Sequence, residues 1–290
     1  MKFTQTEKKQ LMIYVIIAYG ITYVLGLLMW YGYGKGLDLS TFPNAQMLYP
    51  AAGVMMAYLI TRKGDKNLPK AFYIFFVALT AVLVVCTAAS VLAPKNIDLM
   101  GTPFSQWMLI LQYVMIGGSV IFWILLLVSG KEKRRAYGLN SGHWNTSVLM
   151  ILLFIGLYLL RFVIASALGG QLSEFGKIMA NPTTWIMFFT VLVNFFLSVV
   201  AFFGEEYGWR YYLQPLLQKK FGLKGGVILL GCVWAVWHLP IDFFLLYYAG
   251  YGTGGSGKPV CYLYYAWAFY GICLYENPEY LGSGNYSFSE

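Results

Sequence analysis

Residues 184–210 read TWIMFFTVLVNFFLSVVAFFGEEYGWR, an apolar run that ends in two adjacent carboxylates and an arginine. A run of about 20 apolar residues is long enough to cross the hydrocarbon core of a bilayer as a helix. Ionisable groups at membrane depth cost roughly 2.5–3.5 kcal/mol each, so they usually mark a functional site. Glu205, Glu206 and Arg210 are therefore candidate functional residues. The alternative is a solvated helix end in which Glu206 and Arg210 form an ordinary i,i+4 ion pair.

The composition of the whole chain agrees with a membrane location. The 290 residues are 59% hydrophobic and only 11% charged, which is far too apolar for a soluble domain. We expect an all-α fold, a polytopic transmembrane helical bundle in the cell membrane that forms one domain over residues 1–290. The lipid bilayer is its expected partner, and the net charge of +8 follows membrane topology, so no nucleic-acid partner is predicted. The four cysteines lack a C-x-x-C pattern and predict neither a disulfide framework nor a zinc knuckle.

Apolar runs predict seven transmembrane spans and a weaker eighth. They cover about 11–32, 45–61, 71–92, 106–129, 147–168, 183–203, 226–248 and 260–275. Fifteen lysines and arginines fall in the N-terminal segment and in every second loop, against four in the intervening loops. Positive charge is enriched in cytoplasmic loops, so the N-terminus is predicted to be cytoplasmic. The two glutamates then lie at the cytoplasmic end of the sixth span.

The sixth span and the segment after it carry three further signals. Pro182 marks the beginning of the span, since proline is tolerated in the first turn of a helix. Gly204 and Gly208 flank the carboxylates and would let a neighbouring helix pack closely. Residues 210–224 are amphipathic, with Pro215 interrupting them, and are predicted to form a short interfacial segment.

Arg161 is the basic residue that falls inside a predicted span, about two turns from its end. An arginine that snorkels usually lies within a turn or so of the interface. Two interpretations remain open. Either Arg161 faces the bundle interior and a carboxylate partner such as Glu205 or Glu206, or the boundary of the span at 147–168 is misplaced.

A second polar patch lies in the seventh span, where residues 232–240 read CVWAVWHLP. His238 stands inside this apolar run, whereas the other histidine, His143, is in a polar loop and is expected to be solvated. Pro240 leaves the carbonyl of Val236 without its helical partner, so local polarity is expected there. His238 is either a satisfied core residue or a functional one, and the glutamate pair on the preceding helix favours function.

A carboxylate and an imidazole on adjacent helices can carry out general acid–base chemistry on a water molecule. Two neighbouring carboxylates cannot both ionise cheaply at low dielectric. Arg210 would keep one of them charged, and the other would act as the general base. His238 would orient the water or donate to a developing oxyanion. The reaction class favoured by these residues is hydrolysis inside the membrane.

Two other chemistries compete with this interpretation. A divalent metal such as zinc at Glu205, Glu206 and His238 would be an incomplete site, because the His-Glu-x-x-His spacing is absent. A transporter would line its pathway with intramembrane charges, but no clear inverted repeat or pair of broken helices is visible.

The two motifs together resemble the CPBP family of intramembrane proteases. Glu205-Glu206-x-x-x-Arg210 matches its Glu-Glu-x-x-x-Arg motif, and Trp234-x-x-x-His238 matches its Phe-x-x-x-His motif with tryptophan in place of phenylalanine. The family includes type II CAAX prenyl endopeptidases and bacteriocin-processing or self-immunity proteins. The resemblance implies an endopeptidase with a peptide or protein substrate, Glu205 as the water-activating carboxylate, His238 as its partner, and Glu206 with Arg210 as a supporting pair. The family has been described both as metal-dependent and as glutamate-dependent, so a metalloprotease remains open.

The resemblance implies a protease core over about 183–248, but the third motif of the family is missing. That motif is a histidine followed four residues later by Asn or Asp, and no histidine occurs after His238. A frameshift around residues 250–259 would explain both this absence and the unusual composition of 250–290, and the chain as written would then be inactive. The nucleotide sequence of the gene tests the frameshift. The alternative to an endopeptidase is a catalytically degenerate, immunity-type membrane protein that acts by binding, and a Glu205→Ala variant separates these two functions.

Overall fold

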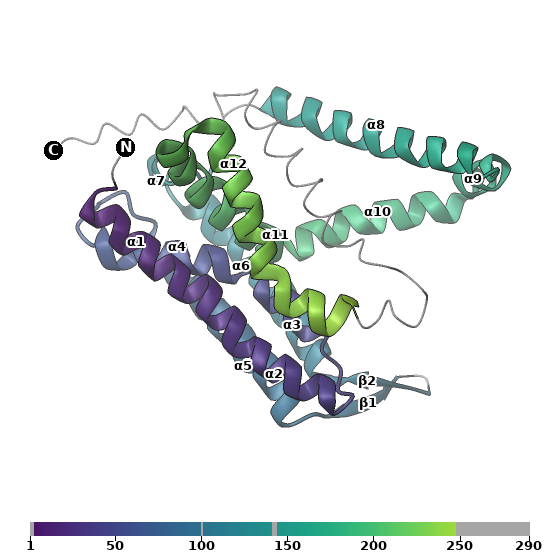
Figure 1. Cartoon of the computed structure of the whole chain (residues 1–290), viewed down its shortest axis with the longest axis horizontal. Helices are drawn as coiled ribbons and strands as arrows, with labels where there is room; N and C mark the ends of the chain where they lie inside the picture. The colour runs from purple at the N-terminus through teal and green to yellow at the C-terminus, as the bar shows by residue number, and fades with distance from the viewer. Residues whose placement is uncertain (1–2, 100, 141–143, 248–290) are drawn as a thin grey trace. The chain divides into compact units, whose positions relative to one another are not determined.

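The computed structural model describes residues 3–99, 101–140 and 144–247, and the chain falls into two compact units. The first unit comprises residues 1–139 and 198–290, and the second comprises residues 140–197. Within the first unit the elements are α1 (Gln5–Val15), the π-helix η1 (Ile16–Gly20), α2 (Ile21–Gly34), α3 (Thr41–Gln46), α4 (Tyr49–Thr61), α5 (Lys70–Leu92), β1 (Asn96–Leu99), β2 (Thr102–Ser105), α6 (Gln106–Val128), α7 (Lys131–Ala136), α11 (Val199–Glu206), the π-helix η2 (Tyr207–Leu213), α12 (Gln214–Ile241) and the π-helix η3 (Asp242–Tyr247). The second unit contains α8 (Trp144–Leu168), α9 (Leu172–Ala180) and α10 (Pro182–Leu197) (Figure 1).

The predicted all-α class and the membrane location are confirmed. Five helical segments of the described residues are long and apolar enough to cross a bilayer. They are Gln5–Gly34, Lys70–Leu92, Gln106–Val128, Trp144–Leu168 and Val199–Leu245. Helices α9 and α10 qualify together as a sixth segment, bent by 71°. The short β1–β2 hairpin is an antiparallel addition to the helices, with Asn96 paired to Ser105.

Some details of the predicted topology are not tested by these helices. The predicted span at 45–61 corresponds to α4, whose 13 residues reach only about 20 Å at 1.5 Å per residue. The count of seven or eight spans, the cytoplasmic N-terminus and the single-domain organisation therefore stay predictions. The predicted span at 260–275, the frameshift region at 250–290 and His143 lie outside the described residues.

The predicted sixth span is not one continuous helix. Helix α10 ends at Leu197, and the backbone of Ser198, with φ −120° and ψ 19°, lies outside the helical region. Helix α11 begins at Val199 and continues directly into η2 and α12. The glutamate pair thus belongs to a new helical segment that begins in the first unit, and the prediction of an unbroken span at 183–203 was wrong.

The first part of the segment predicted to lie at the interface packs in the core, while residues 219–224 are exposed, and its position at a membrane surface stays a prediction. Tyr212, Leu213 and Leu217 are all buried. Pro215 does not interrupt the helix, because the backbone of Leu213 and Gln214 before it keeps helical dihedral angles and η2 runs directly into α12. The backbone leaves helical geometry at Gly222 instead, with φ 76° and ψ 167°, a conformation that glycine adopts without steric penalty.

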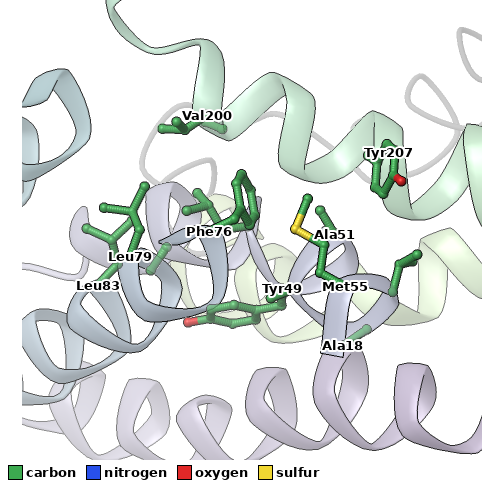
Figure 2. Close-up of a cluster of buried hydrophobic side chains, with 14 of the residues drawn as sticks. Ala18, Tyr49, Ala51, Met55, Phe76, Leu79, Leu83, Val200 and Tyr207 are labelled. Atoms are coloured by element: carbon green, nitrogen blue, oxygen red, sulfur yellow. The ribbon is translucent and has the colours of Figure 1, made fainter. Parts of the chain in front are cut away.

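Helix α4 lies in the middle of the first unit and contacts α1, α5, α11 and η2. In Figure 2, Val200 of α11 and Tyr207 of η2 lie on the side of the buried cluster that faces Ala51 and Met55 of α4. This packing fixes the segment that carries the glutamates against the core. Burial of apolar side chains contributes roughly 25 cal/mol per Å² removed from water, whereas in lipid the same contacts stabilise mainly through close packing.

Gly204 and Gly208 permit the close approach that the sequence predicted. A Cβ built on Gly204 would lie 2.5 Å from the carbonyl oxygen of Met47, and one built on Gly208 would lie 2.2 Å from Cβ of Pro50. Real Cβ atoms essentially never approach other atoms within 3.0 Å. The backbone around the glutamates therefore touches the beginning of α4 directly.

The second unit consists of apolar helices whose side chains are largely exposed within that unit. Arg161 lies in α8, with its guanidinium carbon 5.9 Å from the ring centroid of Tyr158. Its pairing with Glu205 or Glu206 stays a prediction, because those residues belong to the other unit.

Candidate active site

The two glutamates are the last residues of α11, and Arg210 follows in the π-helix η2. Nε of Arg210 lies 3.4 Å from Oε2 of Glu206, so the predicted i,i+4 pair is formed. The side chain of Arg210 is 13% exposed and that of Glu206 is 48% exposed.

The π-helix that follows the glutamates is anchored by a chain of tyrosines. The hydroxyl of Tyr207 donates to the carbonyl oxygen of Tyr137 at 2.9 Å, and it lies 2.6 Å from the hydroxyl of Tyr73. Because the single proton of Tyr207 goes to that carbonyl, Tyr73 donates to Tyr207. The hydroxyl of Tyr137 donates in turn to Asp65, and burial raises the pKa of Tyr137 to about 12, so this donor stays protonated at neutral pH. π-Helices are rare and often lie at functional sites, which agrees with the position of η2 beside two carboxylates.

His238 is held on α12 between two indole rings. Its Nδ1 lies 3.1 Å from the carbonyl oxygen of Trp234. A carbonyl only accepts hydrogen bonds, so Nδ1 carries the proton and Nε2 of the neutral imidazole is an acceptor. The imidazole centroid lies 4.0 Å from the ring of Trp234 and 4.6 Å from that of Trp237. The orientation of the imidazole is therefore fixed by packing as well as by a hydrogen bond.

Trp234 connects the histidine to the glutamate on the other helix. Its indole Nε1 donates to Oε1 of Glu205 at 2.8 Å. Glu205 and His238, which are 33 positions apart in the printed sequence, thus both contact one side chain that is itself only 7% exposed. The structure thus links Glu205 to His238 through Trp234 and pairs Glu206 with Arg210.

Polar side chains donate hydrogen bonds to main-chain carbonyl groups near Pro240, as the sequence predicted. The hydroxyl of Tyr23 donates to the carbonyl oxygen of Val236 at 2.7 Å, which is the carbonyl that Pro240 leaves without a helical N–H. Tyr19 donates to the carbonyl oxygen of Val233 at 2.7 Å, and Gln46 donates to that of Trp237 at 3.0 Å. Side chains from η1, α2 and α3 therefore hold the turn of α12 that carries the histidine.

Replacing Tyr23 by phenylalanine is expected to lower the free energy of unfolding by about 1 kcal/mol, because the carbonyl of Val236 loses its donor where lipid offers no replacement. The measurement is the thermal unfolding midpoint of the detergent-solubilised protein. Tyr31→Phe is the matched control, since Tyr31 is an exposed tyrosine of the same helix. Equal midpoints for the two variants would contradict the assignment of this hydrogen bond.

Asp242 is a further candidate site residue, which the sequence analysis did not single out. It lies four residues after His238, is 7% exposed and interacts electrostatically with the imidazole. Its Oδ1 is buried without a hydrogen-bond partner among the described residues. The i,i+4 rule that paired Glu206 with Arg210 would have paired His238 with Asp242 as well.

The ligand set considered for a metal does not fit the arrangement of these side chains. Among the residues that the structure describes, no three His, Cys, Asp or Glu side chains are close enough to hold an ion together. Glu205 accepts the indole N–H, Glu206 pairs with Arg210, and Nδ1 of His238 faces a main-chain carbonyl. No step of the chemistry below is therefore derived through a metal.

These features define a helical integral membrane protein with a carboxylate and a histidine linked across two consecutive helices. Residues 183–273 match the family model described as type II CAAX prenyl endopeptidase Rce1-like. CAAX prenyl protease 2 of Methanococcus maripaludis is 29% identical over 143 residues, which cover 47% of this chain and 51% of that protein. The resemblance to the CPBP and CAAX protease family that the two motifs indicated is thereby confirmed for residues 183–273.

The extent of this similarity is limited. The match spans about half the length of the curated relative. No solved structure matches the chain. The matched stretch contains the four predicted site residues, Glu205, Glu206, Arg210 and His238. It also contains Trp234 and Asp242.

Proposed function

We propose that the protein is an intramembrane endopeptidase that hydrolyses a peptide bond with a water molecule activated by Glu205. The observation that carries the proposal is that Trp234 contacts both Glu205 and His238, which stand in motifs of a protease family. A general base must lie within hydrogen-bond reach of the proton that it removes, and it acts best when its orientation is fixed. Oε2 of Glu205 accepts no hydrogen bond from the described residues, which leaves it for a water.

The proposed reaction has two proton transfers, one from the water to Glu205 and one from Glu205 to the leaving amine. Glu205 takes a proton from the water as the water oxygen attacks the carbonyl carbon of the peptide bond. The electrons of the C=O bond move to the oxygen and form a tetrahedral oxyanion. When this intermediate collapses, the C–N bond breaks and the proton held by Glu205 passes to the leaving amine. Because Nε2 of neutral His238 is an acceptor, the histidine orients the water in this mechanism and does not donate to the oxyanion.

A prenylated peptide is the first substrate to test, because the family model and the curated relative both carry the prenyl protease name. The full chain, purified in detergent and reconstituted in lipid nanodiscs, is expected to cleave an internally quenched farnesylated CAAX peptide. Mass spectrometry of the products would locate the broken bond. Because Glu205 activates the water without a metal in this mechanism, a chelator is expected to leave the rate unchanged. Loss of activity on chelation, restored by zinc, would overturn the metal-free mechanism.

The second candidate function is that of a non-enzymatic, immunity-type membrane protein. The observation that favours it is that no histidine follows His238, so the third motif of the family is absent. This candidate predicts no cleavage of prenylated or unprenylated peptides, and a cellular phenotype that Glu205→Ala does not change. Cleavage by the wild-type chain that is lost with Glu205→Ala would exclude it.

A further inference from the structure

Trp234 is the residue of α12 that reaches the carboxylate on the neighbouring helix. Its indole N–H donates to Oε1 of Glu205 at 2.8 Å. Its main-chain carbonyl oxygen accepts a hydrogen bond from Nδ1 of His238 at 3.1 Å. The ring of Trp234 also packs against the imidazole at a centroid distance of 4.0 Å. One side chain therefore touches both groups on which the proposed hydrolysis depends.

The hydrogen bond to Glu205 constrains the carboxylate in a specific way. Donation to one oxygen fixes the rotation of the carboxylate and directs the other oxygen, Oε2, away from the indole. Glu205 follows Gly204 on the segment that packs against α4, so its backbone is already fixed and the indole N–H fixes the end of its side chain. Trp234 is nearly fully buried, so it is a rigid donor rather than an adaptable one.

We propose that Trp234 is a positioning residue that holds Glu205 in the orientation for water activation through its indole N–H; this inference rests on the proposed function. The aromatic ring alone does not perform this role, because phenylalanine at the same position would supply the ring contact with His238 but no donor. Trp234 thus contacts both the proposed general base, Glu205, and the histidine.

The test is Trp234→Phe, which keeps an aromatic ring and removes the N–H. Misplacing a catalytic group by about 1 Å costs on the order of 100-fold in rate, so kcat is expected to fall about 10- to 100-fold. KM is expected to stay within about twofold, because Trp234 does not bind the substrate in this proposal. In the Glu205→Gln background the same change is expected to alter the residual rate less than about twofold, since the group to be positioned is already removed.

Trp107→Phe is the matched control. Its indole N–H donates to the carbonyl oxygen of Ala93 at 2.9 Å, at the beginning of α6 and apart from the site residues. This variant loses an indole hydrogen bond of similar length and is expected to keep kcat and KM unchanged. Should Trp234→Phe fail to fold, benzothienylalanine at position 234 keeps the shape of the indole and replaces the N–H by sulfur.

The outcomes separate this inference from the proposed function. If the wild type is active and Glu205→Gln is not, but Trp234→Phe or the benzothienylalanine variant keeps the wild-type kcat, the positioning role is wrong and the protease proposal stands. A rise in KM at unchanged kcat, or an independent further loss in the Glu205→Gln background, would likewise overturn positioning. If the wild type cleaves no peptide, or Glu205→Gln keeps full activity, the proposed function fails and the positioning role fails with it.

Discussion

Replacing Glu205 by glutamine is expected to lower kcat for peptide cleavage by about 10²- to 10⁴-fold, the range attributed to general acid–base catalysis. Glutamine preserves the size of the side chain and can still accept the indole N–H of Trp234, so the fold should be retained. What it cannot do is take a proton from water. The measurement is kcat and KM for the fluorogenic peptide in nanodiscs, with the thermal unfolding midpoint recorded for each variant.

Two further variants serve as comparisons for Glu205→Gln. Glu206→Gln removes the partner of Arg210 but not the base, so a smaller fall in kcat is expected. Glu132→Gln changes an exposed glutamate of α7 and is expected to leave the rate unaltered. Equal losses for positions 205 and 206 would indicate that the two carboxylates act as one unit, and a fully active Glu205→Gln would reject water activation by Glu205.

Gly208→Ala is expected to destabilise the protein by about 3 kcal/mol, at the upper end of the range for overpacking. The new Cβ would lie 2.2 Å from Cβ of Pro50 and 2.6 Å from its backbone carbonyl carbon. Backbone atoms of α4 cannot move aside without shifting the helix, so η2 must separate from α4. The gain of up to about 1 kcal/mol from replacing glycine in a helix does not offset this clash.

The displacement should also affect catalysis, because Glu205 and Arg210 flank Gly208 in sequence. We expect a lower thermal unfolding midpoint and a lower kcat in the same variant. Gly117→Ala is the matched control: Gly117 lies inside α6 with no atom within 4 Å of the built Cβ, so the midpoint should stay the same or rise. If Gly208→Ala were as stable as Gly117→Ala, the close contact between η2 and α4 would be wrong.

Local rules predicted a large part of the site. The Glu206–Arg210 pair follows from the period of a helix, and the need for a donor near Val236 follows from the missing N–H of Pro240. Both features depend on residues at most four positions apart. The same i,i+4 spacing relates His238 to Asp242.

The break at Ser198 had no comparable signal. The residues from 184 to 203 are mostly apolar and include no proline or glycine, so length and composition predicted one span. In the structure, α11 and η2 lie against α4, and this packing is possible because Gly204 and Gly208 have no side chain. Contacts with α4 therefore decide where α11 begins, and the spacing of apolar residues along the sequence does not predict that position.

The sequence by itself determined that the chain is a helical membrane protein with two carboxylates, an arginine and a histidine in its apolar segments. Hydrophobic length and local spacing carry that information, because a helix must satisfy its backbone within the segment. Only the tertiary structure decided which distant groups meet. Trp234 donates to Glu205 across 29 positions, and Tyr23 donates to Val236 across 213. Such pairs depend on which helix faces pack together, and that choice is made by contacts between helices rather than by the pattern within any one of them.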